Sequence, residues 1–431
     1  MHWLLGWLAG LPLWIDLSAS RPYEPIKIIL FEAGVAAAFA VAAFRAWRRG
    51  ILDECSRIAA QAHALDAAVV LFVAALALST ATSVDPARSY WGSEERLTGM
   101  LFYWHGLLLY LLARFGTVRQ DWRFFARSCV LVAFPVVVYG IMQWFGIDVP
   151  GLERAFPIFG RSGPGRAFAT LGHPNFLGAY LAMVAPLFLW TAFSDAKRVW
   201  RIAAWLELPL TALVTVLTYS RGAWIAYAAG VAAFAVFAKP RTRRWHARFF
   251  GGAAGAAFMV IVAVIVAKPF LLDSKNSFLY RVGSSVDWSR GSALARAREW
   301  SYMASLIPNR PLTGYGLDTY MYFSVLRQKD ANEKNRDQDY PDPSAADRAH
   351  DIFLDVLWAG GITALAGFLA VIFTVSRFLG AALGRDSERL FPAAVAAGLI
   401  AYLVGNLASF DFSINGAYLF LFLAAAGYTK K

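Results

Sequence analysis

Charged residues are scarce in this chain of 431 residues: they make up 16% of it, against about 25% in an average soluble domain. Hydrophobic residues reach 58% and aromatic residues 15%. A composition so poor in charge excludes an ordinary soluble globular protein. The sequence therefore predicts an all-α polytopic membrane protein.

Cysteine and histidine are also rare. Both cysteines, Cys55 and Cys129, fall in parts of the chain that we assign below to the cytoplasmic side, which argues against a disulfide framework. The six histidines have neither HExxH-type spacing nor a cysteine cluster beside them. We therefore expect no metal site and no cofactor.

Eleven apolar runs are long enough for a transmembrane helix, which needs about 20 residues or, at the short end, about 17. A twelfth run, residues 3–15, is short but lacks the basic region and cleavage site of a signal peptide, so it counts as a first helix. The sequence thus predicts about twelve transmembrane helices. The eleven longer runs lie near residues 26–44, 64–82, 99–115, 125–146, 175–193, 203–219, 222–238, 249–267, 351–375, 390–408 and 413–428.

Basic residues fill every second connection between these runs. By the positive-inside rule such connections are cytoplasmic, so the net charge of +12 reflects membrane topology, and we expect no nucleic-acid partner. Both termini then lie in the cytoplasm, and the active face lies in the periplasm of a Gram-negative cell. The basic clusters lie in residues 45–57, 114–127, 197–201, 239–248, 377–389 and 430–431.

One long polar segment, residues 268–350, interrupts the apolar runs. Loops longer than about 15 residues are usually functional or disordered, and this one carries helical signals, so we interpret it as a folded periplasmic cap. It separates helices 1–9 (residues 1–267) from helices 10–12 (residues 351–431). Arginines and a histidine on such a cap indicate a site for an anionic, lipid-linked substrate.

Arg221 stands between two apolar runs on the outer side, where a charge is costly and the positive-inside rule does not require one. A planar guanidinium can bind two phosphate oxygens at once, so Arg221 is a candidate phosphate ligand. The alternative is an arginine that extends to the lipid headgroups.

Residues 293–307 have the spacing of an amphipathic helix, with an apolar face made of Trp300, Met303, Ala304 and Ile307. Arg296 shares that face because it lies one turn before Trp300, whereas Arg298 lies about 200° round the helix from Arg296. We therefore choose Arg296 over Arg298 as the anion ligand. The alternative for Arg296 is a stem packed on Trp300 with its charge in water.

His350 opens the apolar run that begins at Ile352, and Asp347 has the position of an N-cap. A helix N-terminus attracts phosphate and lowers the pKa of a nearby histidine, and a neutral imidazole can accept a proton from a hydroxyl group. A histidine at a membrane interface can also be merely amphipathic. Asp351 and Asp355 are the carboxylates nearest to it in sequence, either to orient it or to lie solvated at the edge of the cap.

Several short elements, in this order, resemble the O-antigen ligase and polymerase superfamily of membrane glycosyltransferases over roughly residues 90–425. One departure is Asp351, where that family usually has asparagine. The matching elements are Gly172-His173-Pro174-Asn175 (G-x-P-N), Ser220-Arg221-Gly222 (S-R-G), Arg296 to Trp300 (R-x-x-x-W), Pro311 to Gly316 (P-L-x-G-x-G), and Ala349-His350 with Gly360-Gly361 (A-H-N and G-I-x-G).

The resemblance implies a metal-independent, inverting transfer of a glycan from undecaprenyl pyrophosphate to a hydroxyl group, at the bacterial inner membrane. Arg221 and Arg296 would bind the pyrophosphate and His350 would activate the acceptor. The supporting candidates are Arg96, Asn175, Arg298, Arg348 and Asp351.

Lipid A core is the expected acceptor, in lipopolysaccharide biosynthesis, with a growing glycan (polymerase) or a protein (oligosaccharyltransferase) as alternatives. A transporter of lipid-linked sugars would also have twelve helices. It would be expected to carry charges within several spans and repeat symmetry, and the sequence shows neither.

Overall fold

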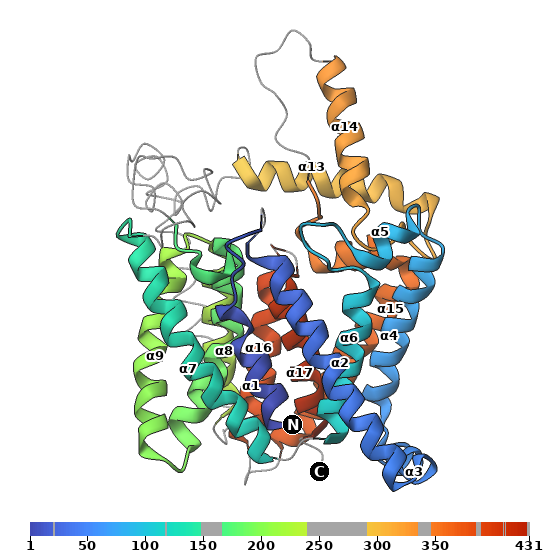
Figure 1. Ribbon diagram of the computed structural model, residues 1–431. Coiled ribbons are helices and arrows are strands. Elements are labelled where there is room, and N and C mark those ends of the chain that lie inside the picture. The colour runs from blue at the N-terminus through green and yellow to red at the C-terminus, as the bar shows by residue number, and fades with distance from the viewer. Residues whose placement is uncertain are drawn as a thin grey trace.

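The computed structural model describes residues 1–19, 22–116, 119–147, 166–238, 291–334, 346–384, 389–407, 409 and 411–428. Regular structure in these ranges is entirely helical (Figure 1). The helices are α1 (His2–Gly10), η1 (Leu11–Leu13), α2 (Glu24–Arg49), α3 (Ile51–Gln61), α4 (Ala64–Ala81), α5 (Pro86–Trp91), α6 (Met100–Gly116), α7 (Arg119–Trp144), η2 (Ala169–Leu171), α8 (Pro174–Ser194), α9 (Arg198–Leu217), α10 (Arg221–Phe237), α13 (Gly291–Leu306), η4 (Ile307–Asn309), α14 (Tyr320–Lys334), α15 (Ile352–Leu383), α16 (Leu390–Asn406) and α17 (Ser413–Tyr428).

The chain is a multi-pass membrane protein. Among the described helices, α2, α4, α7, α8, α9 and α15 are long and apolar enough to cross a bilayer, and α10, α16 and α17 are shorter apolar helices. Each of these helices coincides with one of the apolar runs predicted to form a span, as does α6. The predicted run at residues 249–267 lies outside the described residues.

The short run at residues 3–15 does not form one continuous helix. It folds as α1, which has nine residues, followed by a 3-10 turn that contains Pro12. Nine residues rise only about 14 Å, against a hydrocarbon core about 30 Å thick, so α1 cannot cross the membrane by itself. It packs instead against α7 and α2 and buries Leu4, Leu5 and Leu8.

The centre of the bundle is formed by α8, α16 and α17, which are buried along almost their whole length. α8 packs against α9, α10 and α16, while α4 packs along α15. α3 and the N-terminus lie at one end of the bundle, and α13 and α14 lie at the other (Figure 1).

α15 is broken at Gly361, whose backbone angles (φ 62°, ψ −163°) are not helical. Residues 311–316, the P-L-x-G-x-G element, run beside the break and pair with its open backbone groups, which an apolar environment would otherwise leave unsatisfied. The backbone hydrogen bonds are Tyr315 N to Trp358 O (2.8 Å), Gly316 N to Ala359 O (3.1 Å), Ile362 N to Pro311 O (2.8 Å) and Thr363 N to Leu312 O (3.4 Å).

Replacing Gly361 by alanine should destabilise the protein. A side chain strains the backbone at this φ by about 1–3 kcal/mol, and its Cβ would lie 2.4 Å from the carbonyl oxygen of Leu312. The melting temperature of the purified protein in detergent should therefore fall. Gly380→Ala, in the same helix but with no atom near the added Cβ, is the matched control and should leave the melting temperature unchanged or slightly higher. Equal effects of the two changes would contradict the structural role of the break.

Candidate functional site

A cavity of about 210 Å³ lies where the starts of α8 and α10 and the end of α16 come together under α13. It is smaller than the roughly 300–1,000 Å³ of pockets for drug-sized ligands, so it suits an ionic headgroup better than a whole sugar chain. Its lining residues are Arg166, His173, Asn175, Ala179, Tyr219, Ser220, Arg221, Gly222, Ala223, Arg296, Gly405 and Ser409.

The cavity is cationic. Three of its lining residues are arginines, namely Arg166, Arg221 and Arg296, and no carboxylate stands among the described residues that line it. Burial, and then the positive charge of Arg221, lower the pKa of Arg296, so the fold holds two guanidinium groups near each other at an electrostatic cost. A bound anion would relieve that repulsion.

A tight turn between α9 and α10 places Arg221 at the edge of the cavity. Tyr219 has a left-handed backbone (φ 52°), and Ser220 N donates to the Thr218 hydroxyl at 3.1 Å. Arg166 Nε donates to the Thr218 carbonyl at 2.8 Å, which holds this turn against the segment that precedes α8. The chain therefore enters α10 with Arg221 as its first helical residue, facing the cavity.

Arg296 reaches the cavity from the cap because α13 is fixed by Trp300, one turn further along. The Trp300 indole Nε1 donates to the Ala349 carbonyl at 2.7 Å, next to His350. Met303 on the same face is fully buried, but Ala304 is exposed, so the apolar face of the helix is narrower than predicted. Arg298 is exposed and is not among the cavity residues, so the structure separates it from the site.

His350 lies beside the cavity rather than in its lining. Its backbone is left-handed (φ 59°), and its Nδ1 lies 3.1 Å from the Arg348 carbonyl oxygen. Since a carbonyl only accepts, Nδ1 carries the proton, and Nε2 is the ring nitrogen with the lone pair in the neutral imidazole. Burial lowers the pKa of His350, and the nearby charge of Arg296 lowers it further.

The prediction that Asp347 caps the helix after His350 is wrong. Helical geometry begins only at Ile352, because the left-handed backbone of His350 cannot belong to a helix, and the N-cap is therefore Asp351. Its Oδ1 accepts from the N–H groups of the second and third helical residues, both at 3.0 Å. Asp347 instead forms an ion pair with Arg96.

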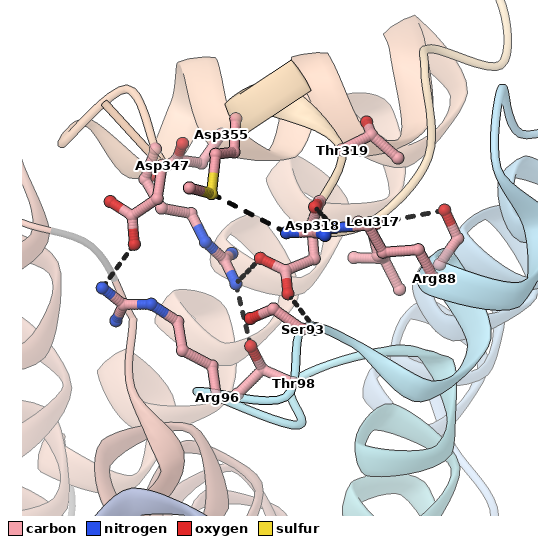
Figure 2. Close-up of polar contacts among 12 residues, drawn as sticks. Arg88, Ser93, Arg96, Thr98, Leu317, Asp318, Thr319, Asp347 and Asp355 are labelled. Carbon is pink, nitrogen blue, oxygen red and sulfur yellow. Dashed lines mark hydrogen bonds and ion pairs between the residues drawn. The ribbon is translucent and has the colours of Figure 1, made fainter. Parts of the chain in front are cut away.

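The other basic candidates hold the cap in place. Arg348 is half-buried. Its Nη2 lies 2.8 Å from the Thr98 hydroxyl and 3.2 Å from Asp318 Oδ1, a carboxylate that also accepts from Ser93 N (Figure 2). Burial alone would raise the pKa of Asp318, but the charges of Arg348 and Arg88 and the hydrogen bonds from Ser93 together outweigh it and keep that pKa below its ordinary value. Arg96 and Arg348 thus join the cap to the loop before α6, and neither lines the cavity.

Two basic lining residues, Arg166 and His173, were not among the sequence candidates. Arg166 stands in a Gly/Pro-rich stretch without a local pattern. His173 is the variable position of the G-x-P-N element, so only its place in that element pointed toward it. It is the N-cap residue of α8, where its Nδ1 accepts from Asn175 N at 3.1 Å.

Comparison with known families gives one match: the model of the family described as O-antigen ligase matches residues 208–369. The matched region contains Arg221, Arg296 and His350, together with the break in α15. A search of curated proteins finds no match.

Trp300→Phe tests how Arg296 and His350 are brought together. Phenylalanine keeps an aromatic ring on Met303 and its neighbours but cannot donate to the Ala349 carbonyl. Loss of this partly buried hydrogen bond costs about 1–3 kcal/mol and should lower the melting temperature of the protein. The melting temperature is measured with purified protein in detergent. A Trp300→Phe protein with the wild-type melting temperature would show that this bond does not hold α13 against the segment before His350.

Proposed function

We propose that this chain, which carries a domain of the O-antigen ligase family over residues 208–369, transfers a glycan from undecaprenyl pyrophosphate to a hydroxyl group of lipid A core. One observation supports this most strongly: a small cavity with Arg221 and Arg296 in its wall lies beside a half-buried histidine, His350, whose Nε2 has a lone pair. A pyrophosphate fits the cavity by charge and size. The cavity would lie on the periplasmic side of the membrane, at the end of the bundle opposite the N-terminus.

In the proposed reaction, the acceptor hydroxyl oxygen attacks the anomeric carbon of the donor sugar. The bond between that carbon and the phosphate oxygen breaks, and its electron pair stays on the departing undecaprenyl pyrophosphate. Arg221 and Arg296 stabilise the charge that develops on this leaving group. The hydroxyl proton passes to His350 Nε2. Because one displacement occurs, on the face opposite the leaving group, the anomeric configuration is inverted.

The left-handed turn at His350 supports its role as the base. Such a backbone costs about 1–3 kcal/mol and persists only where its surroundings fix it. Here the preceding residue is held on both sides: Ala349 N donates to Asp355 Oδ1 at 2.7 Å, and Ala349 O accepts from Trp300. Asp351 then caps the helix that follows. The imidazole is thus oriented before any substrate binds.

Deletion of the gene tests the identity of the acceptor, which is read from the surface polysaccharide on a gel. If lipid A core is the acceptor, long chains should remain on undecaprenyl pyrophosphate and none should appear on core. Core that carries a single repeat unit would instead identify a polymerase, and an unglycosylated protein with normal lipopolysaccharide would identify a protein as the acceptor.

His350→Gln tests the base. Glutamine keeps a hydrogen-bond donor but cannot take up a proton, so the transfer rate should fall about 10²- to 10⁴-fold. Since burial holds the pKa of His350 below its ordinary value of 6.5, the rate of the wild-type enzyme should fall as the pH drops and the imidazole becomes protonated, with its half-maximal value below pH 6.5. The pH profile of the purified enzyme measures this. Near-native turnover of His350→Gln would exclude a general-base role.

A further inference from the structure

His173 is a second histidine at the site, and its ring has the opposite hydrogen-bonding polarity to that of His350. Its Nδ1 accepts the backbone N–H of Asn175 at 3.1 Å, so the lone pair of Nδ1 is already used. In a neutral imidazole the proton then resides on Nε2. At His350, Nδ1 faces a carbonyl, and Nε2 has the lone pair. One ring can accept a proton at Nε2, whereas the other can only donate there.

The ring of His173 is held in one orientation. As the N-cap of α8 it is tied to the first turn of that helix, and it packs against Phe176 with ring centroids 5.0 Å apart. Burial, followed by the charges of Arg166 and Arg96, lowers its pKa to about 4, so it stays neutral near pH 7. It therefore gives the cavity a hydrogen-bond donor without adding a further positive charge to the three arginines.

We propose that His173 is a substrate-binding residue whose Nε2–H donates a hydrogen bond to a phosphate oxygen of the lipid-linked pyrophosphate in the cavity. This inference rests on the proposed function, because it assumes that the cavity binds the donor headgroup. Arg221 and Arg296 then neutralise the pyrophosphate, and His173 fixes its rotation. His173 takes no proton during transfer. The work of the site is thus divided, with one histidine for the leaving group and the other for the acceptor.

Two substitutions separate this role from a purely structural N-cap. In His173→Asn, the side-chain oxygen takes the place of Nδ1 and still caps α8, since asparagine is a favoured N-cap, but the distal donor is lost. In His173→Gln, the amide N–H reaches toward the former Nε2 position, while the cap is weakened because glutamine is not among the favoured N-cap residues. His173→Asn therefore keeps the helix cap and loses the distal donor, whereas His173→Gln keeps a distal donor and weakens the cap.

The experiment measures binding of farnesyl pyrophosphate, a short isoprenoid pyrophosphate, to the purified full-length protein by calorimetry, together with transfer kinetics and melting temperatures. For His173→Asn we expect an unchanged melting temperature and binding weakened about 10- to 100-fold, the usual effect of one hydrogen bond to a charged group, with a corresponding rise in the KM for the donor. His173→Gln should bind more tightly than His173→Asn, even if it melts earlier.

Wild-type binding by His173→Asn, or weaker binding by His173→Gln than by His173→Asn, would overturn the inference and leave His173 as a helix cap. Arg296→Ala and Arg298→Ala are matched variants on one helix, the first in the cavity wall and the second exposed. Arg296→Ala should abolish binding and Arg298→Ala should preserve it. If Arg296→Ala bound the probe like wild type, the proposed function itself would fail, whereas a normal His173→Asn beside a defective Arg296→Ala would reject only the role of His173.

Discussion

The break in α15 is the constraint on which the site depends. A helix that stops and restarts inside an apolar bundle exposes backbone N–H and C=O groups, each costly to leave unpaired. Residues 311–316 supply the partners. The Tyr315 ring stacks on Trp358 with centroids 4.1 Å apart, and its hydroxyl donates to the Leu306 carbonyl at the end of α13. The same pairing that repairs α15 therefore also fixes the helix that carries Arg296.

A second set of contacts links the segment that pairs with the break in α15 to the residues just before His350. The segment after the P-L-x-G-x-G element reaches Asp318, whose carbonyl accepts from Arg88 Nε at 2.7 Å and whose carboxylate holds Arg348, two residues before His350 (Figure 2). A buried ion pair is weak evidence for stability, because desolvation offsets the attraction. Its directional contacts nevertheless leave this part of the cap few alternative positions. The position of His350 thus depends on polar contacts that lie outside the cavity.

The sequence predicted the structure correctly where the result depends on neighbouring residues alone. Apolar run length predicted the long helices, since each must span the same hydrocarbon thickness. Helical periodicity separated Arg296 from Arg298, because one turn of spacing from Trp300 fixes the face. The rule failed at residues 3–15, where a short run with a proline near its end is too brief to span the membrane and packs against its neighbours instead.

The features that the sequence did not predict depend on the conformation of the folded backbone and on contacts between residues far apart in the chain. Asp347 and Asp351 both stand where an N-cap is plausible, and only the left-handed backbone of His350 decides between them. The P-L-x-G-x-G element gave no local sign of its partner, because that partner is a helix break about 50 residues later. The proton position of a histidine is set by the group that one ring nitrogen faces, and no local pattern predicts that group.

Asp351 departs from the asparagine that the resembled family usually has, but both residues can make the same hydrogen bonds as a helix N-cap. Its working atom is a single acceptor oxygen that caps α15, and aspartate and asparagine both offer that oxygen at an N-cap with similar preference. The added negative charge lies at the positive end of the helix dipole, where it is favourable. What the substitution removes is an amide N–H₂, a donor that the cap does not use. Position 351 therefore fixes the start of the helix that follows His350, and the side-chain atom that does so is an acceptor oxygen, which asparagine also has.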